Sequence, residues 1–228
     1  MAHSKYTLTQ VAKTIDHALL RPDMSRDEVA EGCAVALKYD VASVCCKPSD
    51  VAFCAEILKG TDVEVGTVVG FPHGSSTTDT KVFETKNAIA NGATEIDMVL
   101  NIGQLKSGLY DAVKADIAAV VAAAGGKMVK VILENAYLTD EEKITACKLC
   151  EAAGAHYVKT SSGYAPTGAT VADVKLMRAA VSPAVKVKSA GGVRTLDALI
   201  EMLDAGVERS GATTTSTMLD EYTERFGD

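Results

Sequence analysis

Strand-like runs rich in β-branched residues alternate with alanine-rich segments whose apolar residues recur at helical spacing, along the whole chain. The expected strands are six clear runs, at 42–47, 63–70, 95–101, 129–134, 156–160 and 185–189, and two weaker ones, at 14–19 and 207–212. Such alternation is typical of βαβ units and a parallel sheet. Eight units predict an α/β fold, a single (β/α)8 barrel over residues 1–228 with an extra N-terminal helix at 7–13, whereas five or six would fit a doubly wound sheet.

Composition excludes several other classes of protein. The chain carries 23 Lys and Arg against 30 Asp and Glu, and its net charge of −7 argues against nucleic-acid binding, which needs a basic surface. No apolar run approaches the ~18 residues that cross a bilayer. Residues 1–20 also lack the charged-then-apolar pattern of a secretion signal. We therefore expect a cytoplasmic protein with no nucleic-acid partner and no membrane partner.

Six cysteines raise the question of disulfides or a metal site. Cys147 and Cys150 form a CxxC pair, but it falls within an expected helix rather than at the strand-to-helix turn that redox motifs use. A chain of this length buries a sufficient core without covalent links. The cysteines are therefore predicted to be free thiols. The four histidines have no spacing typical of metal ligands, so no metal is expected.

Alternation within the strands predicts which side chains enter the barrel. In the run 185–189, Val185 and Val187 should face the helices, which leaves Lys186 and Lys188 inside. The same reasoning in three other strands places more charged side chains in the interior: Asp97, Lys130, Glu134 and Lys159. Buried charges are costly unless they pair, lose their charge or line a wet cavity, so we expect an interior charge network. The alternative for the two lysines of 185–189 is a sheet edge open to solvent.

Lys159 and Lys188 lie near the carboxyl ends of neighbouring strands, where active sites of such barrels are found. An ordinary lysine has a pKa of ~10.4 and is no nucleophile at pH 7. A second cation nearby and burial both lower that pKa, which is how lysines that form Schiff bases are activated. Asp97 is the candidate for proton transfer. Lys130 and Lys186 are expected to belong to the charge network rather than to the chemistry.

Glycines follow three strands at the same end of the predicted barrel. Gly191 and Gly192 come after the seventh strand, and Gly211 with Thr213 and Thr214 after the eighth. Gly163 follows the sixth strand. Loops at these positions expose backbone N–H groups at helix N-termini and commonly bind phosphate. A phosphorylated substrate is therefore expected.

Five segments resemble the deoxyribose-phosphate aldolase family, which consists of Schiff-base-forming (class I) aldolases. They run over nearly the whole chain and comprise 14–20 (TIDHALL), 69–72 (VGFP), 95–99 (EIDMV), 158–163 (VKTSSG) and 188–194 (KSAGGVR). The resemblance implies a (β/α)8 barrel. It also implies reversible cleavage of 2-deoxy-D-ribose 5-phosphate to D-glyceraldehyde 3-phosphate and acetaldehyde, with no metal and no cofactor. It leaves open a homodimer.

Carried over by position, the resemblance makes Lys159 the imine-forming lysine, Lys188 the neighbour that lowers its pKa, and Asp97 the proton-transfer carboxylate. Asp16 matches a contact to a substrate hydroxyl, and Thr160 belongs to the same motif as the imine lysine. The remaining expected substrate-binding residues are those of the glycine loops: Gly163, Gly191, Gly192, Gly211, Thr213 and Thr214.

The sequence departs from the family pattern around the phosphate. Tyr164 stands where some members carry a lysine, and Thr213 and Thr214 stand where serines are usual. These changes bear on phosphate affinity rather than on imine formation. Two rival interpretations remain at this point: another class I aldolase or transaldolase on the same barrel, and a catalytically silent barrel that serves as a scaffold. The interior lysines argue against the silent barrel.

Overall fold

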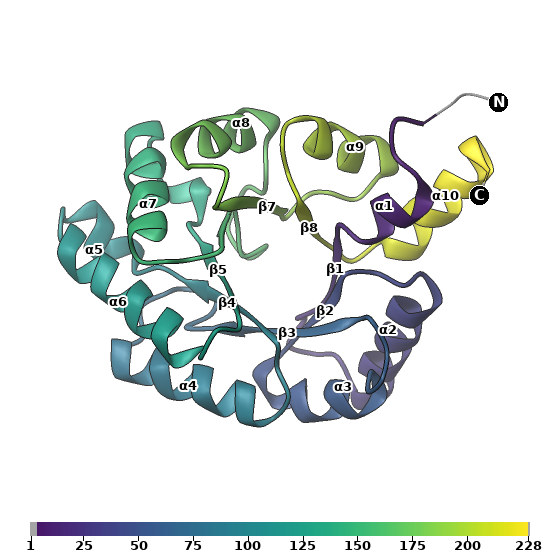
Figure 1. Ribbon diagram of the computed structural model, residues 1–228, viewed down its shortest axis with the longest axis horizontal. Coiled ribbons are helices and arrows are strands. Elements are labelled where there is room, and N and C mark those ends of the chain that lie inside the picture. Colours follow the sequence, from purple (N-terminus) through teal and green to yellow (C-terminus); the bar gives the residue numbers. More distant parts are fainter. Residues whose placement is uncertain (1–3, 228) are drawn as a thin grey trace.

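Eight parallel strands close into a barrel in the computed structural model, which describes residues 4–227 (Figure 1). The strands are β1 (Ile15–Leu19), β2 (Ser43–Cys46), β3 (Glu64–Val69), β4 (Glu95–Val99), β5 (Met128–Ile132), β6 (Tyr157–Lys159), β7 (Lys186–Ala190) and β8 (Arg209–Ala212). Each strand pairs with the next along the chain, and β8 pairs with β1, so that the sheet has no edge. The fold prediction is confirmed, including both weak strands at the ends.

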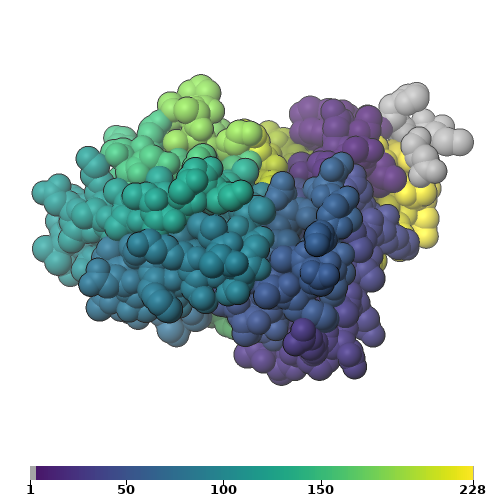
Figure 2. Space-filling model, turned by 60° about the horizontal axis from the view of Figure 1, so that its bottom comes forward, coloured from purple at the N-terminus to yellow at the C-terminus, as the bar shows by residue number. Residues whose placement is uncertain are grey.

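Helices surround the barrel as an outer ring (Figure 1). They are α1 (Leu8–Ala12), α2 (Arg26–Lys38), α3 (Val51–Ile57), α4 (Thr78–Ala90), α5 (Ile102–Lys106), α6 (Tyr110–Ala123), α7 (Asp140–Ala152), α8 (Val171–Ala180), α9 (Leu196–Asp204) and α10 (Thr215–Phe226), with short 3₁₀ turns at Pro48–Asp50 and Asn135–Tyr137. The expected extra N-terminal helix is α1, which packs beside α10. In Figure 2 the blue-to-teal part of the chain comes forward and forms most of the surface on this side.

Local side-chain signals set where several helices begin. Two capping boxes, Ser25 with Glu28 and Thr139 with Glu142, form at the starts of α2 and α7. In each, the hydroxyl accepts from the backbone of the glutamate while the glutamate accepts from the backbone of the capping residue. Each box satisfies backbone donors that the first helical turn leaves free.

The apolar core lies between the outer face of the strands and the helices. Val129, Val131 and Leu133 are fully buried there, as the alternation in β5 predicts. One of the expected interior lysines differs. Lys186, the first residue of β7, keeps 45% of its side chain exposed and pairs with Glu208 at 2.7 Å. It lies at the N-terminal end of the barrel, where an inward side chain still reaches solvent, and so it does not join the interior network.

The six cysteines are free thiols, as expected, and all of them are buried. Residues 4–227 hold no group of three His, Cys, Asp or Glu side chains arranged to bind a metal ion. None of the helices described is long and apolar enough to cross a bilayer.

Candidate active site

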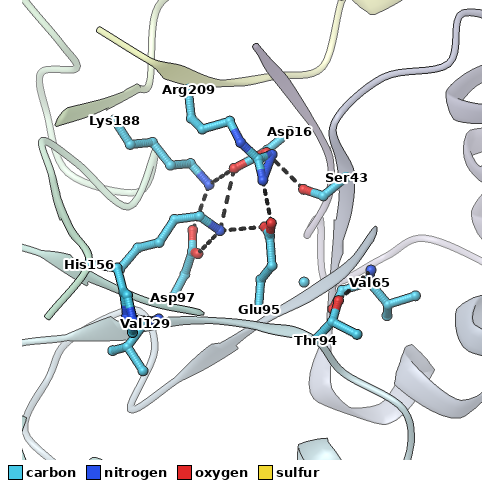
Figure 3. Close-up of polar contacts among 12 residues, drawn as sticks. Asp16, Ser43, Val65, Thr94, Glu95, Asp97, Val129, His156, Lys188 and Arg209 are labelled. Carbon is cyan, nitrogen blue, oxygen red and sulfur yellow. Dashed lines mark hydrogen bonds and ion pairs between the residues drawn. The ribbon is translucent and has the colours of Figure 1, made fainter. Parts of the chain in front are cut away.

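Seven charged side chains meet inside the barrel, and every one of them is buried. They come from β1 (Asp16), β4 (Glu95 and Asp97), β5 (Lys130), β6 (Lys159), β7 (Lys188) and β8 (Arg209). We call this set the interior charge cluster. Figure 3 shows Asp16, Glu95, Asp97, Lys188 and Arg209 of this set pointing toward one another. Parallel pairing makes this possible, because it places Lys159 opposite Lys188 and Asp97 opposite Lys130.

Asp97 joins the two lysines nearest the carboxyl ends of the strands. Its Oδ2 atom lies 2.7 Å from the Nζ atom of Lys159 and 2.7 Å from the Nζ atom of Lys188. Lys188 also forms an ion pair with Asp16. A nucleophile candidate, a second cation and a carboxylate therefore share one small region, as the sequence predicts.

The lower half of the interior charge cluster is built around Lys130 and Arg209. Lys130 Nζ lies 2.6 Å from Glu95 Oε2 and 3.0 Å from Asp97 Oδ1. Arg209 bridges Asp16 and Glu95 with its two terminal nitrogens. Each buried carboxylate thus has cationic partners, which offsets the cost of removing it from water.

The three buried lysines respond differently to this environment. Burial lowers the pKa of Lys159, and the neighbouring charge of Lys188 lowers it further, so that these effects outweigh the opposing attraction to Asp97. Burial also disfavours charge on Lys188, but Asp16 and Asp97 outweigh it and raise its pKa. The pKa of Lys130 is raised well above its ordinary value, because carboxylates again overcome burial. Lys159 is therefore the lysine that most readily becomes a free amine.

A cavity of about 380 Å³ opens above the two upper lysines, at the carboxyl ends of the strands. Its lining includes Asp16, Lys159 and Lys188 at the floor and Gly163, Gly191, Gly192 and Thr213 in the loops. Gly211 also lines the cavity, but it lies within β8 and not after it as expected, because the strand continues to Ala212. Tyr164 and Arg194 also contribute to the lining. Asp97 is fully buried and lies outside the lining, so it reaches the cavity only through its two lysine partners. The volume is ample for a small sugar phosphate.

Glycine conformation shapes the loops at the mouth of this cavity. Gly191 and Gly192 have φ angles of 77° and 88°, in the left-handed region that favours glycine. Gly168, in the loop after β6, packs on the Gly191 carbonyl so closely that an added Cβ would lie 2.1 Å from that oxygen. The Ala169 N–H donates to the same carbonyl at 2.9 Å. The loops after β6 and β7 therefore hold each other in place.

Comparison with known proteins agrees with this geometry. The model of the DeoC/LacD family aldolases matches residues 10–224. The chain belongs to this family. It is 54% identical to the deoxyribose-phosphate aldolase of Streptococcus uberis over 89% of this chain and 92% of that one. It is 55% identical to that of Staphylococcus epidermidis over 88% and 91% of the two chains. A crystal structure from Coccidioides immitis superposes with a TM-score of 0.93 at 39% identity, covering 96% of this chain and 88% of that chain.

Two expected substrate-binding residues of this DeoC/LacD family aldolase lie away from the cavity. Thr160 is fully buried, and its hydroxyl accepts from the Ala190 N–H at 3.1 Å, which ties β6 to β7. Thr214 donates from its hydroxyl to the Arg194 carbonyl at 2.9 Å. Both side chains use their hydrogen bonds to join neighbouring segments, and neither residue is part of the cavity lining.

Sequence reasoning missed two members of the interior charge cluster, Glu95 and Arg209. The signal was present: Glu95 precedes Asp97 by two residues, and Arg209 precedes Gly211 by two, so each shares the inward face of its strand. The β8 strand has few apolar residues to define its faces, which hid Arg209. Glu134 was expected inside the barrel, but β5 ends two residues before it, and its carboxylate accepts hydrogen bonds from Ser162 in the loop after β6 instead of joining the cluster.

Proposed function

We propose that this chain is a deoxyribose-phosphate aldolase that works through an imine on Lys159. It cleaves 2-deoxy-D-ribose 5-phosphate reversibly to D-glyceraldehyde 3-phosphate and acetaldehyde. The observation that carries the residue assignment is the floor of the cavity, where Lys159 faces the lining and shares one carboxylate oxygen with Lys188. The named relatives from Streptococcus uberis and Staphylococcus epidermidis support the activity.

The reaction begins with the free amine of Lys159. Its nitrogen attacks the C1 carbonyl of the open-chain sugar, and loss of one water molecule leaves a protonated imine. This iminium withdraws electrons from the neighbouring C2–C3 bond. Before this attack, the charge of Lys188 disfavours protonation of the Lys159 amine, because two cations in a buried site repel each other.

Bond cleavage needs a proton to leave the C3 hydroxyl. Lys188 reaches the cavity and Asp97 does not, so we assign the transfer to the pair: Lys188 passes a proton to Asp97 as it accepts one from the hydroxyl. The C2–C3 electrons move into the iminium to give an enamine, and glyceraldehyde 3-phosphate leaves. The reverse transfer then protonates C2, and water releases acetaldehyde and restores Lys159.

The substrate phosphate fits the glycine loops at the cavity mouth. Gly163, Gly191 and Gly192 line this region, Gly211 adds the end of β8, and α9 and α10 begin just beyond it. Backbone N–H groups in such loops attract anions without the entropic cost of ordering long side chains. Thr213 adds a hydroxyl. Asp16 lines the floor and is assigned to a hydroxyl of the sugar.

Reductive trapping tests this proposal directly. Acetaldehyde with borohydride should convert the imine to a stable ethylamine, and peptide mass spectrometry should find the ethyl group on Lys159. Lys159→Met is the matched control and should remove the label. Labelling at Lys188, or none at any lysine, would reject the assignment.

A further inference from the structure

The positive and negative charges of the interior charge cluster do not sum to zero when every member is ionised. It contains four cations, three lysines and Arg209, against the three carboxylates of Asp16, Glu95 and Asp97. All seven side chains are buried, so solvent does little to screen the excess positive charge. One cation must therefore be easier to neutralise than the others.

The contacts rank the three lysines. Lys130 lies within 4 Å of carboxylate oxygens from three residues. Lys188 contacts two, and Lys159 contacts only Asp97. Because each carboxylate favours the protonated lysine, Lys159 is the least compensated of the three. Geometry alone thus selects the lysine that loses its proton.

Arg209 is the source of the excess positive charge in the cluster. A guanidinium keeps its charge at every pH that a protein tolerates, so Arg209 cannot relieve the imbalance itself. It bridges Asp16 and Glu95, the carboxylates that also serve Lys188 and Lys130. Arg209 lies outside the cavity lining and is 8% exposed, so direct contact with substrate is not its role.

We propose that Arg209 is a positioning residue whose buried charge keeps the amine of Lys159 unprotonated. Without Arg209, three lysines would face three carboxylates, and Lys159 would retain its proton. The charge acts through the chain of contacts from Asp16 to Lys188 to Asp97. This inference rests on the proposed function, since it concerns the nucleophile of that reaction.

The other titratable groups near Lys159 do not alter this balance. Cys45 of β2 lines the cavity, and burial raises the pKa of its thiol to about 11, so it stays neutral. Burial raises the pKa of Tyr157 beside Arg209, so this phenol is also neutral. Lys186 and Glu208 pair with each other at the far end of the barrel. The described part of β3 brings no titratable side chain into the interior. Its inward residue Thr67 donates a hydrogen bond from its hydroxyl to the Cys46 carbonyl.

The test measures the initial rate of reductive ethylation of Lys159 against pH in four variants. Arg209→Met removes the charge and should move the rising limb of the profile upward by about one pH unit. Arg209→Lys keeps the charge and should leave the limb in place. Glu95→Gln removes a negative charge and should move the limb downward. The Arg209→Met/Glu95→Gln double variant restores the original charge excess and should bring the limb back toward that of the unmodified protein.

The double variant separates electrostatics from packing. If Arg209 had only a structural role, the double variant would be less stable than either single variant, because it loses two buried partners. Its pH profile would then not return to that of the unmodified protein. If Arg209→Met fails to fold, the Glu95→Gln shift and the double variant still decide the question. If Lys159 is labelled but all four variants have unshifted pH profiles, the role of Arg209 is overturned and the proposed function stands. Absence of label in the unmodified protein would instead overturn the proposed function.

Discussion

At the scale of single residues, the proposed chemistry depends on Lys159 contacting a single carboxylate, that of Asp97. An ordinary lysine must lose roughly 3 pKa units, or about 4–5 kcal/mol, before it is substantially unprotonated at pH 7. Burial supplies the largest part of the shift, and the charge of Lys188 adds to it. Lys188 and Lys130 are equally buried but keep their protons, because each contacts more than one carboxylate. Burial by itself therefore does not define the nucleophile.

Lys188→Leu should lower kcat/KM by at least ~10²-fold, the size of effect expected from loss of a positioned acid–base group. It should also move the rising limb of the pH–rate profile upward, because the lost cation leaves Asp97 to hold a proton on Lys159. Steady-state kinetics from pH 6 to 10 would measure both effects.

Lys186→Leu is the matched control for this substitution. It lies two residues earlier on the same strand, is half-exposed and pairs with Glu208 outside the interior charge cluster. Its kinetics should stay within about twofold of the unmodified protein, since exposed ion pairs contribute little. Near-normal activity and an unshifted profile in Lys188→Leu would make Lys188 a packing charge only.

At the scale of elements, the strands build the floor of the cavity and the loops build its mouth. The two lysines of the proposed reaction lie on β6 and β7, whose backbones are held by the barrel pairing. The glycine loops are held by contacts between themselves, such as that between Gly168 and Gly191. Imine formation and phosphate binding should therefore be separable by substitution.

Gly168→Ala should raise KM for deoxyribose 5-phosphate by at least ~10-fold, because its Cβ would force the loops after β6 and β7 apart and small displacements are costly in oriented sites. Borohydride trapping of acetaldehyde on Lys159 should change by less than about threefold, since the strands hold that lysine. Gly103→Ala is the control: an added Cβ there meets nothing closer than 3.7 Å. Equal losses in KM and trapping would contradict the separation.

Removal of the phosphate from the substrate probes the same loops from the other side. Deoxyribose without phosphate should show a much higher KM than its 5-phosphate, because the backbone N–H groups of the glycine loops would have no anion to bind. Paired kcat/KM measurements on the two sugars give the answer. Equal values would exclude a phosphate site at Gly191 and Gly192.

At the scale of the whole molecule, closure of the barrel joins β1 to β8 and to the last helix. His17 of β1 points outward, and its Nδ1 atom lies 2.8 Å from the Thr215 hydroxyl at the start of α10. Burial lowers the pKa of His17 to about 4. Since an unfolded histidine titrates near 6.5, the unfolded chain binds more protons between these values, and stability falls as the pH falls from ~6.5 to ~4. The full loss is about 3 kcal/mol.

His17→Gln should flatten this part of the stability curve. Glutamine still reaches a hydroxyl but takes up no proton, so the free energy of urea unfolding should change much less between pH 6.5 and 4.5 than in the unmodified protein. His73→Gln, at an exposed position, should leave the slope unchanged.

The buried carboxylates of Asp16 and Asp97 affect stability at a lower pH than His17 does. The pKa values of Asp16 and Asp97 are depressed by the cluster cations, which overcome burial, so their contribution is lost only as the pH falls through the unfolded value near 4. A slope above pH 4.5 that is identical with and without His17 would show that another group titrates there.

The sequence by itself determined the barrel and placed most of the proposed reacting groups in its interior. Repetition of strand and helix signals predicted eight units, and alternation within β4 to β7 put Asp97, Lys159 and Lys188 in the interior. These features are local: two- and 3.6-residue periods follow from backbone geometry and need no knowledge of distant contacts. The capping boxes at Ser25 and Thr139 are equally local, since each needs only a hydroxyl residue and a glutamate three positions later.

Only the tertiary structure decided which charges meet. Arg209 and Asp16 are 193 positions apart, and no local pattern predicts that barrel closure brings them into contact. In the structure Lys186 reaches solvent instead of the barrel interior. The hydroxyls of Thr160 and Thr214 hydrogen-bond to backbone groups of neighbouring segments. Strand register and loop packing set these outcomes, because both arise from the closed sheet as a whole. The charge balance around Lys159 is such a property, since its partners come from strands throughout the chain.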